Sequence, residues 1–301
     1  MSPTPQVFDR ALLAYRRRRA CALGPVTFLI DRVAEDMAER LSAVRRSFDV
    51  VVDLGTPTDA VRRAILAAGL VDRVIAAVPM ARAGERTPAV IADEERLPFR
   101  DASLDLVVSG LALQFVNDLP GALVQIRRAL KPDGLFVAAL IGGDTLTELR
   151  QAFAAAEADV EGGVSPRVAP FADVRSMGAL LQRAGFALPV TDVDRVVVRY
   201  DSPLHLMHDL RGMGATNVLR ERRRGGLRRQ TLSRLMEIYA ERFADQDGRL
   251  RATFEIIWLS GWSPHESQQQ PLRPGSARSR LADALGTREV SAGEKPNGET
   301  Q

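Results

Sequence analysis

The first half of the chain alternates between two hydrophobic patterns. Short runs that are apolar at nearly every position are separated by segments in which apolar residues recur every three or four positions. The runs typical of buried strands are Val50–Leu54, Val71–Val78, Ala89–Ala92, Leu104–Val108 and Leu135–Ile141. The segments typical of helices are Pro57–Ala68, Asp118–Leu130 and Thr145–Ala158. Buried strands that alternate with helices predict a parallel sheet with helices on both faces.

After Gly162 the pattern changes to longer strands and a helical insertion. The predicted elements are the helix Asp173–Ala184, the strand Val190–Tyr200, the helices Ser202–Leu210 and Leu227–Phe243, and the strand Arg251–Trp262. The prediction is an α/β fold, with a doubly wound, mostly parallel, seven-stranded sheet and a helical insertion at about residues 202–245 before the last strand.

These patterns divide the chain into three segments. Residues 1–47 are predicted to be a helical N-terminal segment, because Val33, Met37 and Leu41 form an apolar stripe. Residues 48–262 are predicted to form the α/β domain. From Ser263 onward the apolar pattern is lost and Gln, Pro, Gly, Ser and Arg become frequent. Residues 263–301 are therefore predicted to be a mostly disordered tail.

The composition excludes a disulfide scaffold and an integral membrane protein. The 301 residues are 46% hydrophobic and 26% charged, which is ordinary globular usage. Cys21 is the single cysteine, so an internal disulfide is excluded and a reducing compartment fits. No stretch is long and apolar enough to span a bilayer, and acids surround the basic cluster Arg16–Arg19, unlike in a transit peptide. We expect a cytoplasmic protein, either free or held peripherally at the inner membrane.

The charge distribution does not favour nucleic-acid binding. The net charge is only +3, and two of the 41 basic residues are lysine, Lys131 and Lys295. Arg222–Arg224 with Arg228 and Arg229 form a basic cluster, but no aromatic residues are interleaved with them as base stacking requires. We predict a solvated helical segment here and no nucleic-acid partner.

Ligands of open parallel sheets bind in the loops that follow the carboxyl ends of the strands. Four such segments stand out in this chain. They are Asp53-Leu54-Gly55, "ADEERLPFRD" from Ala92, "LDLVVSGLALQFVNDLP" from Leu104 and "LKPDGLF" from Leu130. Together these segments resemble the class I S-adenosylmethionine-dependent methyltransferases.

This resemblance implies a Rossmann-like methyltransferase fold and S-adenosylmethionine as cofactor. In that superfamily an acid and a glycine-rich turn end the first strand, and an acid after the third strand receives the adenine amino group. The positions here that would bind the cofactor are Asp53, Gly55, Asp93, Glu94 and Ser109. The resemblance designates no catalytic residue and no metal ligand.

A narrower resemblance covers about Val7 to Ala277. The matching segments are "VFDRALLAYRRRRA", "LQFVNDLPGAL", "GGDTLTELRQAFAAAE", "EGGVSPRVAPFADVRSMGALLQRAGF", "DLRGMGATN" and "GWSPHESQQQP". They look like the respiratory complex I assembly-factor branch, whose mitochondrial members hydroxylate an arginine of a core subunit. The resemblance implies a protein partner, a subunit of the respiratory complex. The malonyl-carrier-protein methyltransferases are a more distant neighbour.

The glycine-rich turn of the superfamily is altered in this chain. Thr56, Pro57 and Asp59 stand where a cysteine and two glycines are usual. Proline has no N–H to offer and excludes positive φ, and Asp59 would repel the carboxylate of the cofactor. Ala77 lies where an acid that holds the ribose is expected. These changes predict that binding of S-adenosylmethionine is weakened or lost.

The segment "TPTD" also has a purely structural interpretation. Thr56 is a suitable N-cap, Pro57 a suitable first helical residue, and Asp59 would lie near the positive end of the helix dipole. A helix that begins at Pro57 would partly fill the space of a cofactor.

Other chemistry-bearing residues have ordinary structural alternatives. His205 and His208 lie one helical turn apart, as an iron site could require, but such pairs are more often polar surface. Asp144 and Thr145 could line the substrate side of a pocket or cap a helix. Three hypotheses of function follow: a relative of the assembly factor with weak cofactor binding, an active methyltransferase on a small-molecule or carrier-protein carboxyl, and a non-catalytic assembly chaperone.

Overall fold

A computed structural model describes residues 6–80, 88–269 and 286–287. Residues 1–265 form one compact unit, and the unit from Glu266 onward is described only at residues 266–269 and 286–287. Most of the tail that is predicted to be disordered therefore lies outside the described residues. In the described part of the chain, no helix is long and apolar enough to cross a membrane.

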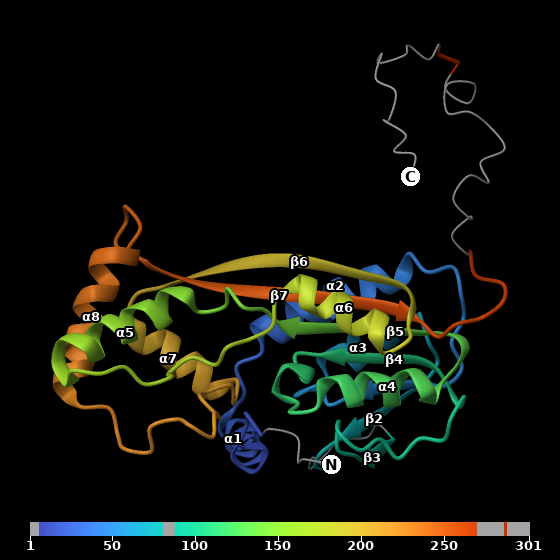
Figure 1. The fold of residues 1–301 in the computed structure, drawn as a ribbon, viewed down its shortest axis with the longest axis horizontal. Helices are drawn as coiled ribbons and strands as arrows, with labels where there is room; N and C mark the ends of the chain where they lie inside the picture. The colour runs from blue at the N-terminus through green and yellow to red at the C-terminus, as the bar shows by residue number, and fades with distance from the viewer. Residues whose placement is uncertain (1–5, 81–87, 270–285, 288–301) are drawn as a thin grey trace, which may run out of the picture. The chain divides into compact units, whose positions relative to one another are not determined.

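A seven-stranded sheet forms the centre of the first unit (Figure 1). The strand order is β3-β2-β1-β4-β5-β7-β6; the first five strands pair in parallel, and β7 is antiparallel to both β5 and β6. The strands are β1 Val51–Leu54, β2 Val74–Val78, β3 Ala89–Ile91, β4 Leu104–Gly110, β5 Leu130–Ile141, β6 Ala187–Tyr200 and β7 Leu250–Trp262. The predicted fold class is confirmed.

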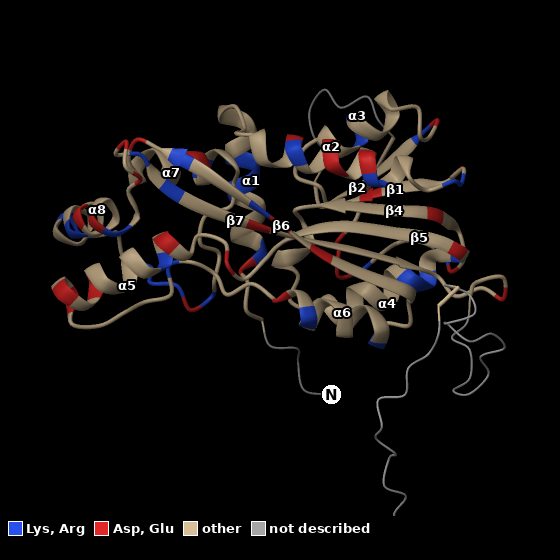
Figure 2. Ribbon diagram, turned by 90° about the horizontal axis from the view of Figure 1, so that it is seen from above, with Lys and Arg blue, Asp and Glu red and all other residues tan. Residues whose placement is uncertain are grey.

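Helices cover both faces of the sheet, as Figure 2 shows. The pair α2 and α3 contributes to one hydrophobic core, and α4 and α6 contribute to the core on the opposite face. The helices are α1 Arg10–Leu23, α2 Phe28–Ser42, α3 Ala60–Ala67, α4 Leu119–Ala129, α5 Thr147–Glu161, α6 Val174–Arg183, α7 Pro203–Gly212 and α8 Arg229–Phe243, with a 3-10 turn at Leu113–Phe115. Most residues of the strands β1, β4 and β5 are therefore buried on both faces of the sheet, which explains why apolar residues predominate in their sequences.

The long hairpin of β6 and β7 carries the helical insertion. Both strands extend beyond the parallel strands, and α5, α7 and α8 gather at that end of the molecule (Figure 1). Leu235, Ile238 and Tyr239 of α8 are buried there, and the Tyr239 hydroxyl donates to the Arg251 carbonyl over 2.8 Å. The insertion thus builds one wall beside the carboxyl edge of the sheet.

The predicted start of the helix after β1 is wrong. The helix α3 begins at Ala60, with Asp59 in the N-cap position, and residues 56–59 form a turn. The Thr56 hydroxyl does not cap the helix, because it donates to the Asp53 carboxylate and accepts from the Gly110 N–H over 2.9 Å. Because the Thr56 hydroxyl is bound to β1 and β4, it is not available to cap the first turn of the predicted helix.

The predicted start of α5 is also wrong. Its N-cap position is Leu146, whose φ of +56° is left-handed, and no side chain caps the helix there. Thr145 is buried instead against β7, where its hydroxyl accepts from the Glu255 N–H over 2.9 Å. Asp144 is half exposed and pairs with Arg195. Neither residue caps α5.

Candidate functional site

The carboxyl ends of β1, β2 and β4 are joined by short hydrogen bonds. The Gly55 N–H donates to the Ala77 carbonyl, and the Ser109 hydroxyl donates to the Leu54 carbonyl, each over 2.7 Å. Gly55 has a φ of +72°, which a side chain would strain, so the glycine permits this tight turn. Ser109 is fully buried in this role.

Asp53 lies beneath the turn in a buried ion pair. One carboxylate oxygen is 2.6 Å from a guanidinium nitrogen of Arg62, and the other accepts from the Thr56 hydroxyl. The side chains of Asp53 and Arg62 are 0% and 1% exposed. Arg62 lies in the first turn of α3 and Asp53 lies in β1, so the pair anchors this helix to the centre of the sheet.

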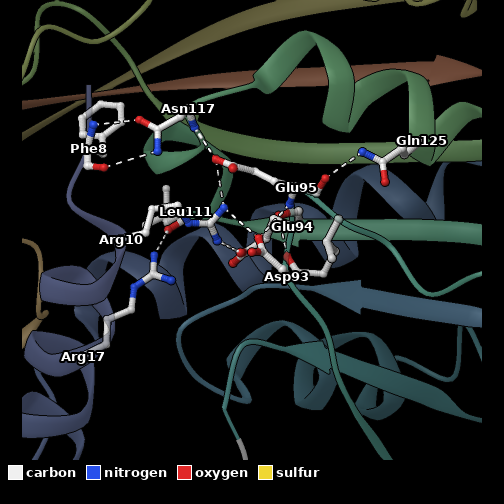
Figure 3. A network of polar contacts seen from close by, with 11 residues as sticks. Phe8, Arg10, Arg17, Asp93, Glu94, Glu95, Leu111, Asn117 and Gln125 are labelled. Carbon is white, nitrogen blue, oxygen red and sulfur yellow. Dashed lines mark hydrogen bonds and ion pairs between the residues drawn. The ribbon is translucent and has the colours of Figure 1, made fainter. Parts of the chain in front are cut away.

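Three acids after β3 surround one arginine of the N-terminal helix (Figure 3). Arg10 contacts Asp93 at 2.8 Å and Glu95 at 3.1 Å, and it donates to the nearly buried carboxylate of Glu94. Burial works to lower the pKa of the Arg10 guanidinium, but the charges of Glu94, Asp93 and Glu95 outweigh burial and raise that pKa above its usual value. Arg10 therefore stays charged and offsets part of the negative charge of the three acids.

Glu94 reaches from this cluster onto the glycine turn. A Cβ atom added to Gly55 would lie 2.5 Å from a Glu94 carboxylate oxygen. The Glu94 side chain therefore packs directly against Gly55, on the side to which any side chain at this position would project. Gly55, Asp93 and Glu94 are brought together as the sequence predicts, whereas Asp53 and Ser109 are buried below them.

The segment before α1 is tied to the same edge. The Phe8 N–H donates to the Asn117 side chain over 2.8 Å, and the Asn117 N–H donates to Glu95 over 2.6 Å (Figure 3). Phe8 also forms an isolated bridge with Leu219. The position of Arg10 is therefore fixed by contacts with both the loop after β4 and the chain after α7.

A cavity of about 350 Å³ lies beside the altered turn. Its volume is typical of a small-molecule site. Loops after β1, β4 and β5 form one side, and α1 and α7 close the other. Its walls are mostly apolar, and its polar lining includes Arg17, Thr58, Asp59, Gln114 and Thr145. The walls include none of the five predicted cofactor-binding residues, so the cavity and the acid cluster are distinct parts of one edge.

Curated relatives match this chain along about nine-tenths of its length. The Methyltransferase domain family matches residues 52–138. Arginine-hydroxylase NDUFAF5, mitochondrial, is 38% identical in Danio rerio, over 92% of this chain and 89% of that protein, and 39% identical in Homo sapiens, over 91% and 82%. The chain belongs to the NDUFAF5 branch of the class I S-adenosylmethionine-dependent methyltransferase superfamily.

This chain is also similar to two proteins described as methyltransferases. A malonyl-[acyl-carrier protein] O-methyltransferase from Laribacter hongkongensis is 37% identical, over 89% of this chain and 91% of that protein. A methyltransferase structure from Bacillus halodurans superposes with a TM-score of 0.51 at 16% identity, over 76% of this chain and 98% of that one. The structural likeness supports the fold alone.

The remaining candidate residues of this member of the NDUFAF5 branch are dispersed. His205 and His208 are exposed on α7, where His205 lies 3.9 Å from Asp201, and Cys21 is exposed at the edge of the cavity. Among the described residues, no group of three or more His, Cys, Asp or Glu side chains is placed to hold a metal ion. Asp144 and Thr145 are the two residues predicted to line the substrate side of a pocket, and of these Thr145 lines the cavity.

Sequence patterns missed Arg10, Arg17, Arg62 and Gln114. Arg10 and Arg17 lie in a helix that contains several arginines, and the local sequence does not show which of these arginines reach the site. The spacing of Arg62 from Asp53 could have indicated the pair, because it lies on the first turn of a helix that follows the acid. The Gln114 side-chain oxygen is buried within the cavity wall without a hydrogen-bond partner among the described residues.

We expect replacement of Arg10 to destabilise the protein. In Arg10→Met the three acids lose their shared cation while Glu94 stays buried, which should cost about 1–3 kcal/mol of unfolding free energy because the cluster is partly exposed. Chemical denaturation followed by circular dichroism measures this cost. Arg100→Met, at an exposed position of the loop between β3 and β4, should change the unfolding free energy by less than about 0.5 kcal/mol. Equal effects of the two replacements would contradict the role of Arg10.

Proposed function

We propose that this protein modifies an arginine side chain of a respiratory complex I subunit and that it binds S-adenosylmethionine weakly. The observation that carries the proposal is identity of 38–39% with arginine-hydroxylase NDUFAF5 over about nine-tenths of the chain. The similarity includes the N-terminal helix and the helical insertion, which build the cavity, and is not confined to the sheet. The partner is thus a protein, and the proposed site of action is the cytoplasmic face of the inner membrane.

Four features support weak cofactor binding. Asp53 is already neutralised by Arg62, and Glu94 packs directly against Gly55. Pro57 offers no N–H in the turn, and residues 74–80 at the end of β2 contain no acid for a ribose. Of the groups that would hold the cofactor, Asp93 alone is both charged and substantially exposed. The retained fold is therefore compatible with a pocket used for another ligand.

A second candidate function is methyl transfer to a carrier-protein carboxyl. It is favoured by 37% identity over nine-tenths of a malonyl-[acyl-carrier protein] O-methyltransferase. Arg17, which lines the cavity and lies over the Phe115 ring at 5.7 Å, could hold the free carboxylate of such a substrate. This function requires firm cofactor binding, which the altered turn opposes.

One experiment separates these functions. Complex I subunits and acyl carrier proteins are purified from the native host with and without the intact gene and mapped by peptide mass spectrometry. The proposal expects an arginine peptide that carries one extra oxygen atom only when the gene is present. A methyl group on a carrier-bound carboxyl would support the second candidate. Failed assembly of the complex with no change in any peptide mass would overturn both in favour of a chaperone.

A further inference from the structure

A second, smaller cavity of about 140 Å³ continues from the large one. The two share five lining residues, which are Phe115, Leu146, Phe171, Leu210 and Ala215. The large cavity lies against the turn after β1, and the small one lies between α5, α7 and the loop of residues 163–173. Together they form one apolar groove that leads away from the edge of the sheet, and we refer to both cavities as the groove.

The loop that borders the far end of the groove is held in place by a buried acid. Glu157 is 1% exposed, and it accepts hydrogen bonds from the Ser165 N–H and the Arg167 guanidinium, each over 2.6 Å. Arg167 also lies over the Phe153 ring at 5.6 Å. Glu157 thus neutralises Arg167 and fixes the loop, so that this end of the groove is formed before any ligand binds.

Four charged residues line the groove, Arg17 and Asp59 in the large cavity and Arg167 and Arg211 in the small one. Asp59 lines the end near the sheet, and its side chain is 58% exposed with one exposed partner, Arg63. Arg211 lines the far end from the last turn of α7; it is exposed and forms no ion pair within the described part of the chain. An acid at one end and an uncompensated base at the other would complement a ligand with the reverse polarity.

We propose that the groove holds an extended peptide segment of the protein substrate and that Arg211 selects an acidic residue near the target arginine. This inference rests on the proposed function, in which the target is an arginine side chain. The target guanidinium would bind in the large cavity beside the Asp59 carboxylate, which attracts it, and away from Arg17, whose cation lies over the Phe115 ring and would repel it. Each residue of an extended chain advances about 3.3 Å, so an acid a few residues away reaches a different part of the groove.

A peptide scan tests the proposal. Fluorescein-labelled peptides of about ten residues carry one central arginine among glycine and serine, with a single glutamate moved to each position on either side. Fluorescence anisotropy measures their affinity for the full chain. We expect one or two adjacent glutamate positions to bind roughly twofold to fivefold tighter than the peptide without glutamate, as for a partly exposed ion pair. The gain should shrink as salt is added.

Charge exchange at Arg211 provides the decisive comparison. The Arg211→Glu variant should lose the preference for glutamate. It should instead bind more tightly to a peptide that carries lysine at the same position. Arg183→Glu is the matched control, because Arg183 is likewise an exposed arginine in the last turn of a helix, α6, and does not line the groove. It should keep the wild-type preference. An affinity that does not depend on glutamate position, or an equal change in both variants, would overturn the proposal.

The peptide scan and the mass mapping fail independently. Affinity is measured without any chemical modification, so a clear position preference with no modified arginine in the host would support the groove and overturn the proposed activity. A modified arginine in the host with no position preference in the scan would support the proposed activity and overturn the role of the groove.

Discussion

Replacing Arg62 by methionine should destabilise this protein by about 3–5 kcal/mol, because the change leaves the Asp53 carboxylate charged and buried without its principal cation. A typical domain has only about 5–15 kcal/mol of stability, so the variant would be close to unfolded at elevated temperature. Guanidinium denaturation at neutral pH, followed by circular dichroism, measures the difference in unfolding free energy.

Arg63→Met is the neighbouring control. Arg63 is 63% exposed and pairs with Asp59 and Asp31 at the surface, so its replacement should cost less than about 1 kcal/mol. A double replacement of Asp53 by leucine and Arg62 by methionine should cost less than the sum of the two single changes, because no unpaired charge is left. If Arg62→Met costs no more than Arg63→Met, the pair does not hold α3 to the sheet.

The order of elements could be predicted because it depends on local pattern. The strand predicted at Val50–Leu54 is found at Val51–Leu54, and the strand predicted at Val190–Tyr200 extends to Ala187–Tyr200. Period and burial are properties of neighbouring residues, so a single sequence contains them. The helical insertion at about residues 202–245 is also predicted by the change of hydrophobic pattern after Gly162. The sequence predicts a mostly parallel sheet, but it does not predict that β7 is the antiparallel strand.

The site could be predicted only where its residues follow strands. The sequence places Gly55, Asp93 and Glu94 together because the carboxyl ends of parallel strands meet at one edge, and their role in binding a cofactor stays a prediction. Arg10 was missed because 84 residues separate it from Glu94 in the chain. The start of α3 was wrong for a related reason: Thr56 has the right residue type for a cap, but its hydroxyl bonds to Asp53 and Gly110 in the folded chain. Local propensity cannot identify such partners.

Replacing both Pro57 and Asp59 by glycine should strengthen the binding of S-adenosylmethionine by about tenfold, which corresponds to about 1.4 kcal/mol. The first change restores a backbone N–H and permits positive φ in the turn, and the second removes a carboxylate that would face the carboxylate of the ligand. Calorimetric titration compares the dissociation constants of the double variant and the wild-type chain.

Single variants separate the two causes of this gain. Asp59→Asn keeps the size of the side chain and removes its charge, so it should improve binding of S-adenosylmethionine but not of methylthioadenosine, which lacks the amino-acid carboxylate. Identical dissociation constants in all variants would show that Glu94 against Gly55, and not the turn, limits the ligand. Because Asp59 also lines the groove, the same Asp59→Asn change should weaken binding of arginine peptides. If Asp59→Asn strengthens the binding of S-adenosylmethionine and weakens the binding of arginine peptides, then Asp59 in the altered turn disfavours the cofactor and favours a cationic side chain.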